Sequence, residues 1–162
     1  MGAACSQLWM NLRAIGDNEP KVNKTKIKGI IQAWTKLDPV KAIQELRKHM
    51  TKEPYRYDKL FRILPIINTV DTNLNLIKAE VESQKGKIGL HETFRVTVEK
   101  RKTELRSMEV IEKIAEVIDQ KVDLSEPNWV VLVEIMGKTT GISVIRPENI
   151  MNIQKERYRL SL

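Results

Sequence analysis

The residue types best suited to chemistry in this sequence are cations gathered around one predicted strand. Lys100-Arg101-Lys102 directly follow the alternating segment Phe94–Glu99, and between residues 85 and 106 seven cations face only three carboxylates. Ammonium and guanidinium groups at a strand end can neutralise phosphates and release their counterions. The full set of candidate phosphate-binding residues is Arg62, Lys85, Lys87, Arg95, Lys100, Arg101, Lys102, Arg106 and Lys138. The alternative is an ordinary solvated run of charges.

Signatures of catalysis are missing. The sequence contains neither a G-x-x-x-x-G-K-S/T cradle nor a G-x-G-x-x-G loop after a strand. Its single cysteine, Cys5, lies in an N-terminal stretch that we expect to be frayed, and the two histidines are too few for most metal sites. We therefore expect no enzymatic activity, no cofactor, no metal and no small-molecule substrate. Acid–base pairs distant in sequence remain open.

Aromatic residues are sparse, and Phe94 and Trp129 lie in apolar strands where we expect them to be buried. A stacking platform for bases needs exposed aromatic rings. The sequence therefore favours recognition by shape and backbone charge.

Composition is typical of a globular protein. The chain has 162 residues, of which 41% are apolar and 30% charged, and this argues against a disordered, membrane or collagen-like chain. The net charge is +7; residues 1–60 carry 12 basic and 6 acidic side chains, and residues 61–162 carry 16 and 15. This excess indicates an anionic partner, most commonly nucleic acid, or else a salt-bridged, lysine-rich surface. A lone cysteine suits a reducing, cytoplasmic location.

Strand and helix patterns alternate along the chain after a predicted loop at 11–26. Strands are predicted at 27–34, at 60–70, at 94–99, at 129–136 and at 142–145, and Pro65 within the second of them implies an edge strand, a bulge or a short break. Helices are predicted to begin at Asp38-Pro39, at Asp71/Thr72 and at Ser107. This order predicts an α/β fold with a mixed sheet that ends in a hairpin. In the tail 147–162, Ile150, Ile153 and Leu160 are candidates for docking on the core.

An ordered set of short segments over about residues 57–150 resembles the THUMP domain, an RNA-binding module of tRNA-modifying proteins. Each segment is weakly specific alone, but their order and spacing agree with that family. The segments are Arg62-Ile63-Leu64-Pro65-Ile66, Thr93-Phe94-Arg95-Val96, the Lys100-Arg101 pair, Glu109-Val110-Ile111, Val122-Asp123-Leu124 with Pro127, Val133-Glu134-Ile135 and Ile142-Ser143-Val144.

The chain looks most similar to stand-alone THUMP proteins that assist the tRNA cytidine acetyltransferase. That resemblance implies a THUMP domain at 57–162 and a tail with a short ferredoxin-like segment at 1–56. It further implies binding near the tRNA acceptor stem and 3′ end by the candidate residues above, and no catalysis. The catalyst forming N4-acetylcytidine would be a separate chain. The ferredoxin-like part is shorter than usual, and we expect it to be a β-α unit that completes the sheet.

The alternative is a small RNA-processing or RNA-modifying enzyme whose site is not visible in the sequence; tRNA binding without turnover would favour the adaptor. Asp123, Leu124 and Pro127 are interpreted as structural. Leu124 is expected to fill the core between the third helix and the strand that begins at Trp129, and Pro127 to fix the start of that strand.

Overall fold

The computed structural model describes residues 2–162, which form two compact units. The first unit comprises the chain up to Pro65 together with Glu148–Leu162, and the second comprises Ile66–Pro147. The sequence alone predicts a division between residues 56 and 57. No helix among the described residues is long and apolar enough to cross a membrane.

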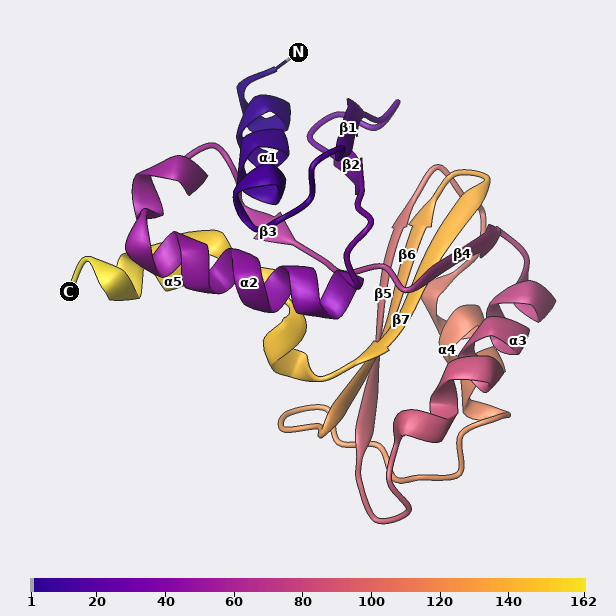
Figure 1. Cartoon of the computed structure of the whole chain (residues 1–162). Coiled ribbons are helices and arrows are strands. Elements are labelled where there is room, and N and C mark those ends of the chain that lie inside the picture. Colours follow the sequence, from indigo (N-terminus) through magenta and orange to yellow (C-terminus); the bar gives the residue numbers. More distant parts are fainter. Residues whose placement is uncertain (1) are drawn as a thin grey trace. The chain divides into compact units, whose positions relative to one another are not determined.

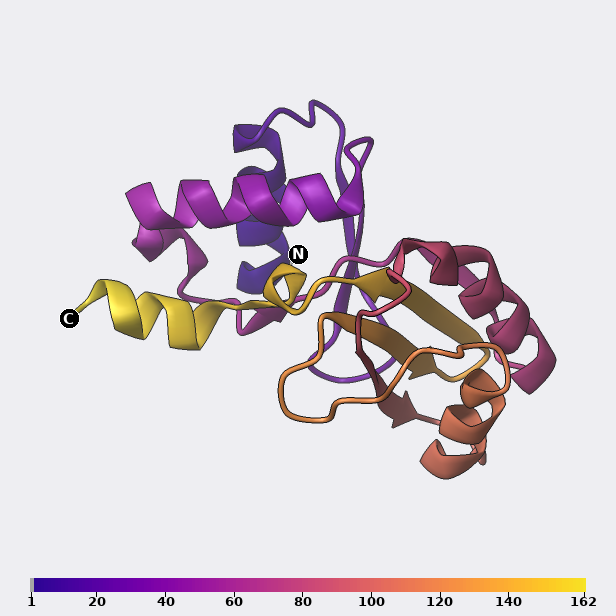
Figure 2. The same ribbon diagram turned by 90° about the horizontal axis from the view of Figure 1, so that it is seen from below.

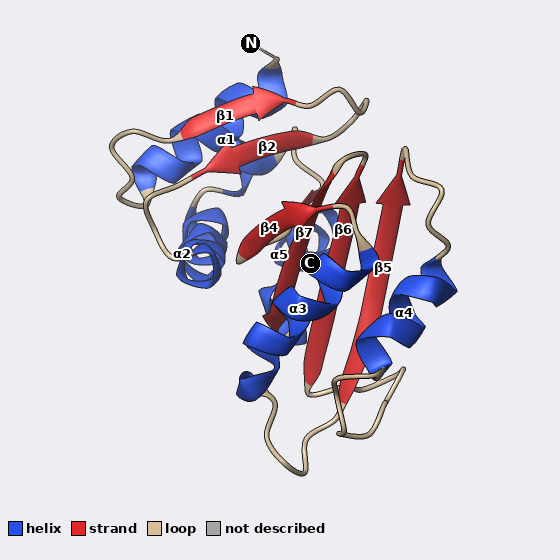
Figure 3. Ribbon diagram, turned by 90° about the vertical axis from the view of Figure 1, so that its right-hand side faces the viewer, coloured by secondary structure: helices blue, strands red, loops and turns tan. Residues whose placement is uncertain are grey.

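The second unit is built on a four-stranded mixed sheet in the order β4-β7-β6-β5 (Figure 3). Its strands are β4 (Asn68–Asp71), β5 (Phe94–Arg101), β6 (Trp129–Met136) and β7 (Thr139–Ile145). β7 pairs antiparallel with both β4 and β6, whereas β5 and β6 are parallel. The predicted α/β class with a mixed sheet is therefore confirmed, as is the hairpin formed by β6 and β7, although further elements follow it in the chain.

Two helices, α3 (Leu74–Gln84) and α4 (Ser107–Ala115), contact each other and cover one face of this sheet (Figures 2 and 3). A parallel pair of strands needs a crossover connection, and α4 lies in the one that joins β5 to β6. Because side chains alternate along a strand, every second residue of each strand faces the helices. The resulting core contains Ile77, Val81, Phe94, Val110, Ile114, Val131, Val133, Ile135, Ile142 and Val144.

The first unit contains three α-helices, two small sheets and a 3₁₀ turn, Pro54–Tyr57 (Figure 1). Its helices are α1 (Ala3–Ala14), α2 (Pro39–Lys52) and α5 (Ile153–Leu160), and its strands are β1 (Lys21–Lys24), β2 (Ile31–Trp34), β3 (Arg62–Ile63) and β8 (Met151–Asn152). β1 pairs with β2, and β3 pairs with β8, both antiparallel. Its core contains Cys5, Leu8, Leu12, Val22, Ile43, Leu46, Met50, Tyr57, Met151 and Ile153.

The local signals that predicted α2 act as expected. Asp38 is the N-cap, and its carboxylate accepts a hydrogen bond of 3.0 Å from the backbone N–H of Lys41. Pro39 supplies the fixed φ that suits the first helical position. Ile43, Leu46 and Met50 are buried along one face of the helix, as their spacing predicted.

Several expectations about the first unit were wrong. The N-terminus is helical rather than frayed, and Cys5 is buried at 1% exposure on α1. The predicted loop at 11–26 contains the end of α1 and all of β1. β1 and β2 form a separate two-stranded sheet and do not complete the sheet of the second unit. In the tail, Ile153 is buried but Leu160 is exposed.

A break at Pro65 is present, whereas two predicted helix starts and one core prediction needed correction. The run 60–70 divides at Pro65 into β3 and β4, which belong to different sheets, because proline cannot donate a ladder hydrogen bond. The caps of α3 and α4 are Asn73 and Arg106 rather than Asp71/Thr72 and Ser107. Leu124 is 71% exposed and does not fill the core.

Candidate nucleic-acid interface

Five of the candidate cations gather at the end of the sheet where the parallel strands β5 and β6 finish. We call Lys100, Arg101, Lys102, Arg106 and Lys138 the strand-end group. Arg101 lies opposite Met136 in the β5–β6 register, and the N–H of Gly137 donates to the Arg101 carbonyl at 2.9 Å. This bond brings the turn that carries Lys138 against the end of β5.

The chain turns sharply within the strand-end group. Lys102 has a φ of +54°, in the left-handed region that a non-glycine residue adopts rarely. Lys100 donates from Nζ to the carbonyl of Leu105 at 3.2 Å, and Arg106 pairs with Glu109 at 3.1 Å while 80% of its side chain stays exposed. Lys100, Lys102 and Lys138 are also exposed. Four cations are therefore presented to solvent at one end of the sheet.

Arg101 differs from its neighbours in the strand-end group. Its guanidinium Nη1 donates to the Glu134 carboxylate at 2.7 Å, and the Glu134 side chain is only 8% exposed. The Arg101 side chain is 29% exposed. This cation therefore compensates a buried carboxylate on β6 as well as lying at the predicted surface.

Lys85, Lys87 and Arg95 lie at the opposite end of the second unit. Arg95 and Lys100 are five residues apart along β5, which corresponds to about 17 Å. Each of the three cations donates to a backbone carbonyl within the unit: Lys85 to Val117 at 2.7 Å, Lys87 to Val144 at 3.3 Å and Arg95 to Leu124 at 3.0 Å. Arg62 is exposed on β3 in the first unit. The structure thus separates candidates that are close in sequence.

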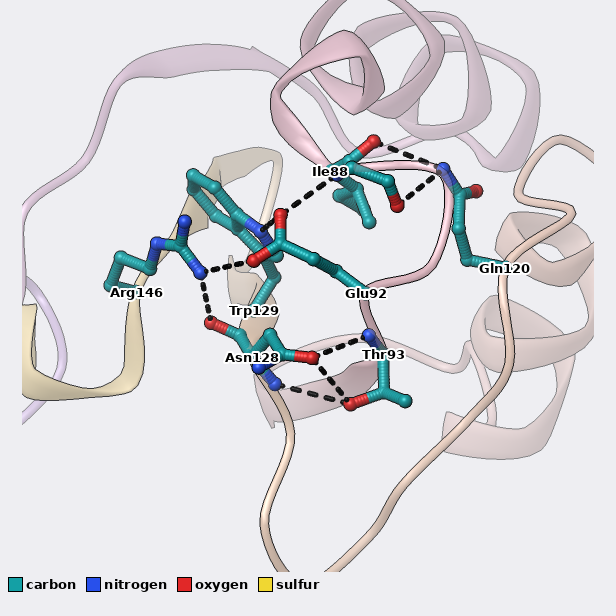
Figure 4. Close-up of polar contacts among 8 residues, drawn as sticks. Ile88, Glu92, Thr93, Gln120, Asn128, Trp129 and Arg146 are labelled. Carbon is teal, nitrogen blue, oxygen red and sulfur yellow. Dashed lines mark hydrogen bonds and ion pairs between the residues drawn. The ribbon is translucent and has the colours of Figure 1, made fainter.

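A polar cluster that includes Glu92, Trp129 and Arg146 lies beside the starts of β5 and β6 (Figure 4). The Glu92 carboxylate accepts hydrogen bonds from Trp129 Nε1 at 2.8 Å, from the Gly89 N–H at 2.9 Å and from Arg146 Nη1 at 2.7 Å. The Arg146 guanidinium also lies 4.0 Å from the centre of a Trp129 ring. Nearby, Asn128 Oδ1 accepts from the N–H of Thr93 at 2.8 Å.

These contacts depress the pKa of Glu92 from its ordinary value of 4.5 to about 2, through the bonds from Trp129, Arg146 and the Gly89 N–H. A carboxyl group whose pKa is lower in the folded state stabilises the fold at pH values above its ordinary pKa of 4.5. This stability is lost as the pH falls from 4.5 towards 2. We expect Glu92→Gln to be less stable than wild type at pH 7, with a gap that narrows below pH 4. Thermal unfolding at pH 7 and below pH 4 measures the difference in stability between Glu92→Gln and wild type, with Glu112→Gln at an exposed position as the control. A gap that is the same at both pH values would contradict it.

The net positive charge of the protein belongs to the first unit. Its residues carry 16 basic and 8 acidic side chains, whereas the second unit carries 12 and 13. The exposed tryptophan, tyrosine and phenylalanine side chains are also in the first unit: Trp34, Tyr55, Phe61 and Tyr158. Sequence reasoning did not identify these rings as exposed, because residue type alone does not separate an exposed ring from a buried one.

Loop contacts explain the position of the Asp123–Pro127 segment. The Asp123 carboxylate accepts from the N–H groups of Ser125 and Glu126, both at 3.0 Å, and its own N–H donates to the Phe94 carbonyl at 3.0 Å. Asp123 therefore stabilises a turn beside β5. That turn directs Leu124 towards solvent. Among residues 2–162, no three His, Cys, Asp or Glu side chains are grouped so that they could hold a metal ion.

A mixed sheet with two helices on one face defines the second unit, and its sequence identifies the class of domain. Residues 71–145 match the family model of the THUMP domain. The chain therefore contains a THUMP domain. No curated protein matches the sequence.

Two solved structures have similar folds. PH1313 from Pyrococcus horikoshii Ot3 has a TM-score of 0.65 and 18% identity, over 89% of this chain and 47% of that one. TrmN from Thermus thermophilus has a TM-score of 0.62 and 17% identity, over 86% of this chain and 41% of that one. The similarity thus extends beyond the THUMP domain into the first unit, and the chain spans less than half the length of either protein.

Proposed function

We propose that this chain binds tRNA and presents it to a separate enzyme that forms N4-acetylcytidine. The observation that carries the binding proposal is the strand-end group on a THUMP domain: exposed cations from β5, from the start of α4 and from the β6–β7 turn gather at one end of one sheet. Such cations neutralise backbone phosphates and release counterions. The resemblance to stand-alone THUMP adaptors supports the acetyltransferase as the partner.

The second unit is suited to reading backbone charge more than bases. Lysine and arginine contacts to phosphates fix the register of a nucleic acid without reading its sequence. Among described residues of this unit, none of the exposed large apolar side chains is aromatic. We therefore infer that it recognises the shape and charge of the tRNA.

An adaptor without a reaction of its own can still accelerate the reaction of its partner. Holding the tRNA beside a catalyst turns a bimolecular encounter into one governed by a high effective concentration. This role needs affinity for the tRNA and for the enzyme but no reactive group. We accordingly propose that every step of acetyl transfer takes place in the partner.

Affinity for tRNA is expected to fall steeply with salt. If four to six phosphates are neutralised, the slope of log K against log salt is about −3 to −5. The triple variant Lys100→Ala, Lys102→Ala, Lys138→Ala should bind more weakly and should flatten that slope by about 2–3. Fluorescence anisotropy with labelled tRNA across a salt series measures both quantities.

The matched control removes three lysines elsewhere in the same unit, Lys78, Lys113 and Lys121. Two of these lie on the helices, where they pair with Glu116. We expect this control to keep most of the slope. A wild-type slope near zero would remove the binding proposal, and equal losses in both triple variants would remove the strand-end group as the contact.

Acetylation assays test the adaptor role. The purified chain with tRNA and acetyl-CoA should form no acetylcytidine. Adding the acetyltransferase should give product, and the chain should raise its yield at low tRNA concentration, with the strand-end triple variant losing that gain. Acetylation or RNA cleavage by this chain alone would favour the enzyme alternative, and a partner indifferent to this chain would leave tRNA binding only.

A further inference from the structure

The β1–β2 hairpin of the first unit is rich in lysine and lacks carboxylates. In the N-terminal half of the chain, no longer stretch contains cations but no acidic residue. Residues 20–35 include Lys21, Lys24, Lys26 and Lys28 and no aspartate or glutamate. All four lysines are exposed. Elsewhere in the unit the lysines lie among acidic residues; on α2, for example, Lys48 pairs with Glu45. The hairpin is therefore a concentrated positive feature.

The strand register gives this hairpin two different faces. Val22 is buried with α1 residues in the core of the unit. Because neighbouring residues of a strand point to opposite faces, Lys21 and Asn23 lie on the other face. They are paired across the strands with Trp34 and Gln32. One face thus places a cation, two carboxamides and an indole side by side, and the Trp34 side chain is 50% exposed.

The base of the hairpin is fixed by Asp17, which is only 2% exposed. Its carboxylate accepts hydrogen bonds from Thr35 Oγ1 at 2.6 Å, from the N–H of Lys36 at 3.1 Å and from the N–H of Glu19 at 2.9 Å. Lys36 and Glu19 also form an ion pair of 2.9 Å. These contacts join the segment before β1 to the segment after β2. The outward face is consequently held in place before any ligand arrives.

We propose that the β1–β2 hairpin is a second RNA contact, at which an unpaired nucleotide stacks on Trp34 while the hairpin lysines neutralise the adjoining phosphates. This proposal rests on the proposed tRNA binding and adds a site of different chemistry to it. The strand-end group offers charge alone, whereas the hairpin face combines charge with an exposed ring and hydrogen-bonding amides.

Single-stranded RNA is the ligand that this combination fits. Every base has a flat face that can stack on an aromatic ring. The edges of an unpaired base can also exchange hydrogen bonds with carboxamides such as those of Asn23 and Gln32. In a duplex the bases already stack on one another, so an indole at the surface finds no free base. The lysines attract single-stranded and duplex RNA alike, and stacking on Trp34 favours the single strand.

Variants of Trp34 test the stacking contact. Trp34→Ala is expected to weaken binding of a single-stranded oligouridylate by about 5- to 150-fold, and Trp34→Phe should retain part of that affinity because it keeps a ring. Binding of a blunt RNA duplex should change little in either variant. Circular dichroism confirms folding, which an exposed side chain should not disturb. Equal affinity of wild type and Trp34→Ala for the oligouridylate would overturn the stacking contact.

Glutamine substitution of the four hairpin lysines tests the charge contact. Each phosphate neutralised on a single strand contributes about 0.7 to the slope of log K against log salt. Loss of four lysine contacts should therefore reduce the magnitude of that slope for the oligouridylate by about 3. The matched control replaces the same number of exposed lysines on α2 and the segment after it: Lys41, Lys48, Lys52 and Lys59. Equal slopes in the two variants would overturn the charge contact.

The two proposals fail in distinguishable ways. A wild-type protein that binds neither tRNA nor oligouridylate at low salt overturns both. A protein that binds tRNA through the strand-end group, with hairpin variants that match wild type on both probes, overturns the hairpin site alone. Hairpin lysines that bind anionic lipid vesicles but contribute nothing to RNA affinity would also overturn it.

Discussion

Phe94→Ala is expected to lower the free energy of unfolding by about 3–5 kcal/mol. Phe94 is 2% exposed at the start of β5 and packs in the core shared by the sheet, α3 and α4. Removing its ring sacrifices the transfer free energy of the ring and leaves a cavity that the surrounding strands can fill only in part. Chemical denaturation followed by far-UV circular dichroism measures the loss.

Leu124→Ala is the control for Phe94→Ala. Both positions belong to segments that resemble the THUMP family, but Leu124 is 71% exposed. Its truncation should change the stability by no more than about 0.5 kcal/mol. A loss at Leu124 as large as that at Phe94 would show that Leu124 is buried, as its sequence context had suggested.

The second unit was the more predictable part of the fold because its strands are long and apolar. The run Trp129–Met136 gave a strand with those same bounds, and the alternation from Phe94 onwards gave β5. Burial on both faces makes such strands nearly continuous in apolar residues, which is a strong signal. The capping chemistry of Asp38 placed the start of α2 equally well.

The first unit was harder to predict because its elements are short or lack local signals. No side chain caps α1, and its first turn holds small residues, so the sequence gives no start signal there. β1, β3 and β8 have two to four residues each, too few for a periodic pattern. Pairing between residues far apart in the chain, such as β3 with β8, fixes them instead.

The candidate site was predicted in its residue types but not in its grouping. Lys85, Lys87 and Arg95 precede the Lys100 run closely in sequence, yet an extended strand carries the chain about 3.3 Å per residue and so separates them from it. Lys138 comes back to the strand end only because β6 is parallel to β5. The hairpin lysines are not recognisable as a group in the sequence, because its local pattern predicts a loop at 11–26 and a strand only from 27 onwards.

Arg101→Ala is expected to lower the free energy of unfolding by about 2–4 kcal/mol. The substitution removes the guanidinium that lies 2.7 Å from the Glu134 carboxylate, and that carboxylate is largely buried on β6. Loss of one partner of a buried pair is costly because the remaining charge has been taken out of water. The partial exposure of Arg101 places the expected loss below that of a fully buried pair.

Two further variants distinguish a structural role of Arg101 from a role in RNA binding. Arg101→Met with Glu134→Leu removes both charges and should recover most of the lost stability, because an apolar pair of similar size replaces them. Lys102→Ala, next to Arg101 but exposed, should leave the stability almost unchanged while weakening tRNA binding. If Arg101→Ala instead keeps full stability and weakens tRNA binding as Lys102→Ala does, Arg101 acts on phosphate rather than on Glu134. The two cations are neighbours in the sequence, and the comparison measures how far the ion pair of Arg101 with the buried Glu134 carboxylate sets the stability of this end of the sheet.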